Sequence, residues 1–465
     1  MTYTAADFFS GGGGSSSGML KVPGVELAIA CNHWTLAVQM HALHFPKAEH
    51  RCADLSQVDF RTFPRVDLLW GSPECTNHSI AQGRKQAQED RVPDAEGNTL
   101  PTEAGARSRA TMWDIPRYLE AMINRGRPVL GGVTENVVDV AKWVLFPAWR
   151  KTLEALQYDV TPVYMNSAHA HARRSLWSPQ SRDRVYFLYV HKSVGRKIDI
   201  EKWTRPWATC TEHGVVRGRQ VFKRTDREAW GRFKAQYFFV CTVPGCALVV
   251  EPVALPASEA VDWTNPGQRI GDRAKPLAEK TLKRIEDGLK RYARPMMIPT
   301  EGREGKLAKP LDEPGRTQTT RRESAVLFTP AFVAELRGGH SKHRSLDDPL
   351  ATVTAGGFHH ALVVPYYGTG RAKPVDRPLG TLSTVDRFAL VEQQARVEDC
   401  SLRMLQVPEI ARAMSFEPDH QVLGNKRAGT RLLGNAVCPP NAEVLMSAVV
   451  ETISGEPLEP APCLV

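Results

Sequence analysis

The chain of 465 residues is long enough for two to four domains of ordinary size, or for one large domain with insertions. Its hydrophobic content of 42% predicts a buried core and excludes wholesale disorder. No apolar run reaches the length of about 18 residues that a membrane-spanning helix needs. The net charge of +9 fits a polyanionic partner such as nucleic acid. The N-terminus lacks the features of a secretory signal, so we expect a soluble cytoplasmic protein.

Residues 1–190 alternate between apolar runs and amphipathic stretches. The apolar runs predict strands over Val25–Ala30, Val66–Trp70, Pro128–Val133 and Val185–Val190. The stretches between them predict helices over Thr35–His44, Met112–Asn124 and Ala141–Leu156. This alternation indicates an α/β domain with a parallel sheet covered on both faces. In such sheets ligands bind beyond the carboxyl ends of the strands.

Residues 191–395 have a different character, rich in Lys, Arg, Pro, Thr and Trp, with helical periodicity only over Leu277–Tyr292. A degenerate repeat joins an acidic-x-Pro turn to a Thr-rich run, at 311–320, 346–355 and 375–384. Turn followed by short strand predicts a smaller β-rich domain. Residues 396–455 return to helix, over Leu402–Met414 and Asn441–Thr452.

Polar or glycine-rich segments follow the first three strands. The run Asp7–Gly14 is rich in glycine, which lets a backbone approach a phosphate or carboxylate, although a flexible linker has the same composition. Trp34 follows the second strand and can lie against an adenine, while Asp54 follows the third and can accept from an exocyclic amine. Together they indicate a nucleoside pocket.

Three further side chains suggest catalysis. Cys75 lies just past the strand Val66–Trp70, where a thiolate can act as a nucleophile, although isolated cysteines are more often buried and inert. Glu135 follows the next strand and can act as a general acid, or simply favour the start of a helix. Arg182 and Arg184 are spaced to share one face of a strand and can grip a base or phosphate.

Two pairs of possible metal ligands lie about 30 residues apart in the chain. They are Cys210, His213, Cys241 and Cys246. Their spacing resembles a zinc ribbon with one cysteine replaced by histidine, within an insert at 205–250. The alternative is four unrelated residues. If a zinc ion binds, we expect a structural site.

In their order and spacing these motifs resemble the DNA cytosine-5 methyltransferase family of the bacterial or phage type, across residues 1–190 and 396–450. The matching positions are Asp7, Phe9, Gly11, Gly13, Gly14 and Gly18 (D-x-F-x-G-x-G-G-x-x-x-G); Pro73, Cys75 and Ser79 within GSPECTNHS (G-G-P-P-C-Q-G-F-S); Glu135, Asn136 and Val137 (E-N-V); Gln180, Arg182 and Arg184 (Q-x-R-x-R); Arg403–Glu409 (R-x-L-T-P-R-E); and Gly434–Val437 (G-N-[AS]-V). The departures are Glu74, Thr76 and His78 around the nucleophile, and His33 where the family has the acid that binds the ribose hydroxyls.

The resemblance implies a Rossmann-like S-adenosylmethionine-dependent methyltransferase domain over 1–190, a target-recognition domain over 191–395, and a C-terminal segment at 396–455 that returns to the first domain. It implies that Cys75 adds to C6 of a cytosine flipped out of double-stranded DNA, and that S-adenosylmethionine then methylates C5. Glu135 would bind the N3/N4 edge of the base, and Arg184 with Arg182 would hold O2. The cofactor would contact Asp7, Phe9, Gly11, Gly13, Gly14, His33, Trp34, Asp54, Pro73, Asn435 and Val437.

Three alternatives keep parts of this prediction: the same mechanism with a modified alkyl donor, which the departures around Cys75 leave open, a tRNA cytosine-5 methyltransferase, and a DNA-binding relative without activity. The large basic insertion favours duplex DNA over tRNA. We further expect residues 76–110 to form a mobile loop that closes over the flipped base. The default expectation is a monomer, with a companion restriction endonuclease as a possible partner.

Overall fold

The computed structural model describes residues 1–74, 91–93, 99–101, 110–292, 296–299, 306–318, 320, 323–328, 332–335, 343–345, 360–363 and 397–463. The chain divides into two compact units. The first contains Met1–Val261, Asp312–Arg322 and Gln406–Val465, and the second contains Asp262–Leu311 and Glu323–Leu405. Among the described residues, no helix combines the length and apolar character needed to cross a membrane.

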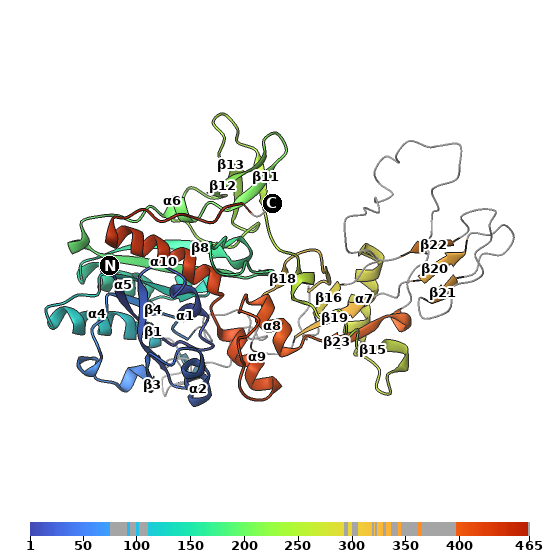
Figure 1. The fold of residues 1–465 in the computed structure, drawn as a ribbon, viewed down its shortest axis with the longest axis horizontal. Coiled ribbons are helices and arrows are strands. Elements are labelled where there is room, and N and C mark those ends of the chain that lie inside the picture. Colours follow the sequence, from blue (N-terminus) through green and yellow to red (C-terminus); the bar gives the residue numbers. More distant parts are fainter. Residues whose placement is uncertain are drawn as a thin grey trace. The chain divides into compact units, whose positions relative to one another are not determined.

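A seven-stranded sheet lies at the centre of the first unit, in the order β3-β2-β1-β4-β7-β10-β8 (Figure 1). Its strands are β1 (Tyr3–Phe8), β2 (Val25–Asn32), β3 (Glu49–Cys52), β4 (Leu68–Gly71), β7 (Gly131–Asn136), β8 (Tyr158–Asn166) and β10 (Asp183–His191). The first five are parallel to one another, but β10 runs antiparallel to both β7 and β8. The prediction of a parallel sheet was therefore wrong for β10. Because β8 and β10 follow one another in the chain and pair directly, their connection needs no helical crossover.

Helices cover both faces of this sheet: α4 (Asp114–Asn124) and α5 (Phe146–Ala155) pack on one face, and α1 (Gly14–Met19) and α10 (Pro439–Ser454) pack on the other. The first unit also contains α2 (Thr35–His44), α6 (Ile200–Trp203), α8 (Val407–Ala413) and α9 (Lys426–Asn435). Side chains along β1 alternate between two cores: Ala6 and Phe8 pack with residues of α4 and α5, and Ala5 packs with residues of α1 and α10. This alternation is the period of two expected for a strand buried on both faces. The predicted α/β fold class is confirmed.

A closed four-stranded barrel also belongs to the first unit. It consists of β11 (Trp207–Cys210), β12 (Gly214–Phe222), β13 (Tyr237–Cys241) and β14 (Val249–Pro252). Its interior residues Ala208, Tyr237 and Phe239 belong to the same buried cluster as Phe8 of the sheet. The predicted boundary at residue 190 therefore falls inside the first unit, because one apolar core continues across it.

The second unit is rich in short strands. One sheet contains β15 (Gln268–Arg269), β16 (Met296–Pro299), β17 (Lys309–Pro310), β19 (Ser324–Phe328) and β23 (Ser401–Met404), with helix α7 (Glu279–Tyr292). Another contains β20 (Phe332–Glu335), β21 (His343–Ser345) and β22 (His360–Val363). The predicted repeats at 346–355 and 375–384 lie outside the described residues. Two small pairings complete the topology, β5 (Arg91–Pro93) with β6 (Thr99–Pro101), and β9 (Gln180–Ser181) with β18 (Gly315–Arg316).

The helix predicted over Leu402–Met414 starts later than expected. Its first residues form β23, and α8 begins only at Val407. A capping box between Gln406 and Glu409, with Pro408 in the first turn, fixes this start. The prediction was wrong at 402–404 because apolar residues spaced for a helix also suit a short strand.

Candidate active site

Most of the predicted site residues gather at one edge of the central sheet. In the strand register Phe8 lies beside both Cys31 and Gly71, and Gly71 lies beside Thr134. The segments that follow β1, β2, β3 and β4 therefore leave the sheet at the same edge as Glu135. Strand β10 runs the opposite way and begins at that edge with Asp183 and Arg184.

The glycine-rich loop after β1 is held from inside the protein. The Asp7 carboxylate is fully buried and accepts hydrogen bonds of 2.6 Å from both the Ser15 and Ser16 hydroxyls of α1. Burial raises the pKa of Asp7 to about 6, and the two hydroxyl groups oppose that shift. Phe9 adopts a φ of 62°, which is rare for a residue with a side chain. Asp7 was predicted as a cofactor contact. In the structure its carboxylate connects the end of β1 to α1 through these two hydrogen bonds and so holds the loop between them.

Two glycines of the motif are required by packing. A Cβ on Gly14 would lie 1.9 Å from the Val437 carbonyl oxygen, and one on Gly18 would lie 2.1 Å from the Pro439 carbonyl oxygen. The loop therefore touches the segment that starts α10. The backbone contact explains why the loop and the distant Gly434–Val437 motif occur together. Asn435 is exposed at the end of α9, and Val437 is buried.

A cavity of about 750 Å³ opens beside Trp34, which precedes α2. Its lining residues are Trp34, Thr320, Asn425, Arg427, Ala428, Thr430 and Arg431. The Arg431 guanidinium lies 4.7 Å from the centre of the Trp34 ring. The volume is of the size that small-ligand sites have. The sequence analysis missed Arg427 and Arg431, although the amphipathic run before Gly434 was a usable signal for α9.

Two positions where the sequence departs from the family pattern lie close together after β2 and β4. His33 Nδ1 lies 3.7 Å from Glu74 Oε1, and both side chains are partly exposed. Asp54 accepts hydrogen bonds from the Ser56 amide and hydroxyl groups. Pro73 is buried, and the Glu74 amide donates to Thr111 Oγ1. Glu74 is the last described residue before Cys75. Cys75 itself, Ser79 and most of the predicted loop at 76–110 lie outside the described residues.

Glu135 and Arg184 form an ion pair at the sheet edge. Arg184 Nε lies 2.8 Å from Glu135 Oε1, and the side chains are only 13% and 10% exposed. The pairing of β7 with β10 brings them together. Glu135 lies beside Tyr186 in the register, and Arg184 is two residues before Tyr186 on the same strand. A carboxylate and a guanidinium held side by side can present acceptor and donor atoms together to one planar ligand.

Arg182 does something different from its neighbour in the motif. It is 3% exposed and donates to three backbone carbonyl groups, those of Gln318, Gly434 and Ala436, at 3.1 to 3.2 Å. Its guanidinium therefore ties together three segments that are distant in sequence. The sequence analysis predicted that Arg182 helps Arg184 to hold a base, and these hydrogen bonds favour a positioning role instead.

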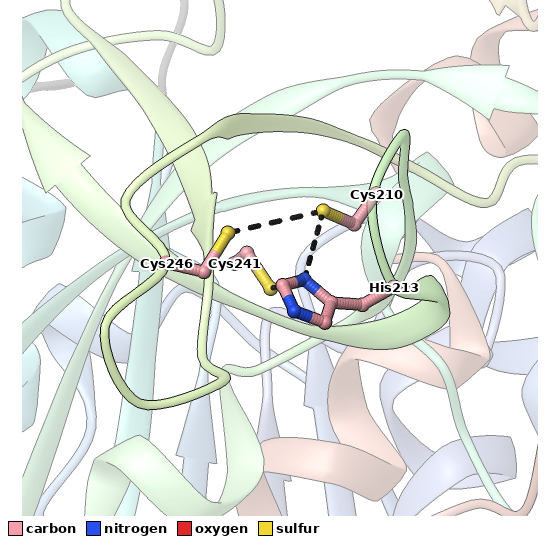
Figure 2. Close-up of side chains that lie close together, drawn as sticks. All are labelled: Cys210, His213, Cys241 and Cys246. Atoms are coloured by element: carbon pink, nitrogen blue, oxygen red, sulfur yellow. Dashed lines mark hydrogen bonds between the residues drawn. The ribbon is translucent and has the colours of Figure 1, made fainter.

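The four predicted metal ligands meet at one end of the barrel (Figure 2). Cys210 ends β11, His213 lies in the turn to β12, Cys241 ends β13, and Cys246 lies in the loop to β14. One ligand atom from each residue lies within 4.8 Å of all the others. The geometry brings together what the sequence had only suggested by spacing.

The sheet order and the helical layers on both faces are those of the Rossmann-like fold that is typical of S-adenosylmethionine-dependent methyltransferases. Residues 3–95 match the family described as C-5 cytosine-specific DNA methylase. Over these residues the match confirms the resemblance inferred from the motifs. The sequence matches none of the curated proteins.

Solved structures resemble the chain over nearly its whole length. The Dnmt2 methyltransferase of S. pombe has a TM-score of 0.51 at 14% identity, with 97% of this chain and 99% of that chain covered. A DNMT2 mutant of Spodoptera frugiperda has a TM-score of 0.49 at 13% identity, covering 97% and 100%. The methyltransferase EhMeth of Entamoeba histolytica has a TM-score of 0.48 at 11% identity, covering 97% and 98%. At these identities the S. pombe structure supports the fold alone.

Proposed function

We propose that the protein is a DNA cytosine-5 methyltransferase in which Cys75 is the covalent nucleophile. The observation that carries this proposal is the Glu135–Arg184 ion pair, in which the two charged groups lie 2.8 Å apart at one edge of the sheet. Strand β4 ends at the same edge, and residues 72–74 continue from it toward Cys75. The family match over residues 3–95 includes Cys75 and supports the same conclusion.

In the proposed reaction the Cys75 thiolate adds to C6 of cytosine, which makes the ring an enamine that is nucleophilic at C5. Glu135 stabilises the ring by hydrogen bonding to its N3/N4 edge, while Arg184 orients Glu135 and donates to O2. S-adenosylmethionine, when bound, supplies the methyl group. Loss of the C5 proton to a base then expels Cys75 and restores the aromatic ring. The target must leave the stacked duplex for this geometry, so base flipping is part of the proposal.

We place the adenosyl part of this cofactor against the Trp34 ring, which lines the cavity. Asp54 and the loop at Phe9–Gly14 lie outside the cavity lining, but they follow β3 and β1 at the same edge of the sheet. There Asp54 would accept from the adenine amino group, and the loop would offer backbone amides to the carboxylate. We infer that Glu74 supplies the carboxylate that His33 does not, because the two side chains lie 3.7 Å apart. The substitution of a glutamate beside the nucleophile and the loss of an acid at position 33 would then compensate each other.

The decisive experiment expresses wild type, Cys75→Ser and the matched control Cys463→Ser in a host without cytosine methylation. Nucleosides from DNA and from RNA are then identified by mass. We expect 5-methylcytosine in DNA from wild type and Cys463→Ser, and none from Cys75→Ser. A modified cytosine found only in RNA would overturn the DNA substrate. A different mass on cytosine would overturn methyl as the transferred group, and no modification at all would overturn the activity.

A further inference from the structure

We propose that Cys210, His213, Cys241 and Cys246 bind one zinc ion, and that this ion ties together the two connections at one end of the β11–β14 barrel. The site is structural, since four protein ligands leave no coordination position for a substrate. The proposal concerns the fold and does not depend on the reaction that the enzyme catalyses.

The distances between the ligand atoms match a tetrahedral zinc site. The Cys210 and Cys246 sulfur atoms lie 4.0 Å apart, and His213 Nδ1 lies 3.6 Å from the Cys210 sulfur and 3.8 Å from the Cys241 sulfur. Zn–S bonds of about 2.3 Å at tetrahedral angles separate two sulfur atoms by about 3.8 Å. A disulfide would need sulfur atoms about 2.05 Å apart and would leave a third cysteine and the histidine unused.

The location of the cluster suits a cross-link. Its ligands come from two chain segments, the β11–β12 turn and the end of β13 with the loop that follows. Strands β11 and β14 have only four residues each, so the barrel encloses little apolar volume of its own. The barrel shares its core with the central sheet, and a metal ion would add a cross-link at the end of the barrel where its strands are short. The ion would hold both connections at one end of the barrel.

The barrel in turn braces the catalytic sheet. The Phe233 amide donates to Asp183 Oδ1 at 3.1 Å, and Asp183 lies between Arg182 and Arg184. Gln220 Nε2 donates to the Tyr164 carbonyl oxygen of β8 at 3.0 Å. Arg232 pairs with Asp139, just after β7. Through these contacts a loosened barrel would weaken the support of Asp183, which is next to Arg184, the partner of Glu135.

The test is metal analysis of the full-length protein purified without chelators from zinc-supplemented cells. We expect about one zinc per chain in wild type and in the control Cys52→Ser, which changes an exposed thiol outside the cluster, and a strong loss in Cys246→Ser. Wild type with less than about 0.2 zinc per chain would overturn the proposal, since structural zinc binds tightly at neutral pH. So would an unchanged zinc content in Cys246→Ser.

A second pair of variants covers the case in which Cys246→Ser does not fold. His213 is exposed, so its replacement disturbs little packing. His213→Cys should retain about one zinc in a four-thiolate site, whereas His213→Ala should lose it and unfold at a lower temperature. In the cobalt-substituted protein, intense visible absorption typical of tetrahedral thiolate coordination is expected for wild type. Equal zinc content in His213→Cys and His213→Ala would contradict the role of His213, whether or not methylation is detected.

Discussion

Arg182 and Arg184 are two positions apart in the chain and make different contacts: Arg182 donates to backbone carbonyl groups, and Arg184 pairs with Glu135. The sequence analysis placed them on one face because alternate residues of a strand share a face. However, β10 begins at Asp183, so Arg182 lies before the strand and is free of its periodicity. Its guanidinium turns inward to the carbonyl groups of Gln318, Gly434 and Ala436. The motif could be recognised from sequence, but these different contacts could not, since two of the carbonyl groups lie at the end of α9, more than 250 residues away by the numbering.

Arg182→Met should therefore destabilise the protein. The change leaves three carbonyl groups without a charged donor, and we expect a loss of about 3 kcal/mol in the free energy of unfolding. Urea denaturation measures this loss. Arg150→Met is the control, because Arg150 pairs on the surface with Glu154 and Glu228 and such pairs contribute about 0–1 kcal/mol. Equal effects of the two changes would contradict the positioning role.

Glu135→Gln should reduce turnover without preventing folding. The amide keeps the size of the side chain but removes both the charge that pairs with Arg184 and the ability to exchange a proton with the ring. We expect kcat to fall by about 10²–10⁴-fold, the range of general acid–base catalysis, with little change in cofactor affinity. Glu154→Gln, on the outer surface of α5, is the matched control. A near-normal kcat for Glu135→Gln would refute its catalytic role.

Glu74→Gln tests the compensation proposed at the cofactor edge. If Glu74 supplies the acceptor for the ribose hydroxyl groups, the KM for S-adenosylmethionine should rise by about tenfold, as expected for one hydrogen bond to a charged group. The kcat at saturating cofactor should change less. An unchanged KM together with a reduced kcat would instead assign Glu74 to the chemistry beside Cys75.

Among the elements, the predictions were best where periodicity and end signals agreed. Helix α2 has the predicted bounds of Thr35–His44, and the predicted strand Val25–Ala30 forms most of β2. Barrel strands β11–β14 were missed because their pairing is set by the common core with the sheet and not by a local pattern. The gathering of the candidate site residues at one edge of the sheet was predictable, because the carboxyl ends of parallel strands lie side by side. The contacts of Asp7 with Ser15 and Ser16 were not, since a glycine-rich loop can fold back on either side.

The packing of α1 against α10 makes neighbouring glycines unequal. Gly14→Ala should cost about 3 kcal/mol or more, because the new methyl group would meet the Val437 carbonyl oxygen at 1.9 Å and force the two segments apart. Gly12→Ala is the control within the same loop, since its nearest neighbours lie at 3.4 Å and beyond. Thermal unfolding of both variants measures the difference. Similar melting temperatures would show that α1 can shift without cost.

At the scale of the whole first unit, two neutral histidines lie where the barrel meets the sheet. His171 accepts a hydrogen bond from the Trp207 amide and donates one to the Val253 carbonyl group. His169 packs against the rings of Phe233 and Phe239. Burial lowers the pKa of His169 to about 3, with smaller contributions from His171 and Lys234. His169 therefore stays neutral in the folded protein at pH values where the unfolded chain protonates it.

This difference in protonation predicts a loss of stability in mild acid. Below the unfolded pKa of 6.5 the unfolded state binds a proton that folded His169 rejects, so stability falls as pH falls, by about 1.4 kcal/mol per pH unit, until pH approaches 3. His169→Phe removes this contribution and keeps an aromatic ring. Between pH 6.5 and pH 5 the variant should lose about 2 kcal/mol less than wild type in urea denaturation. Parallel pH profiles for the two proteins would contradict the prediction.

The chain passes from one unit to the other four times, and residues 312–322 form a short segment of the first unit between two segments of the second. Gly315 pairs there with Gln180, and Gln318 offers its carbonyl oxygen to Arg182. The second unit is therefore not one continuous segment of the chain, and it cannot be exchanged as a single block without also replacing residues of the first unit. A chimera that replaces residues 262–405 as a block would also replace Gly315 and Gln318, which contact Gln180 and Arg182 of the first unit. One that transplants 262–311 and 323–405 while retaining 312–322 would leave those contacts in place.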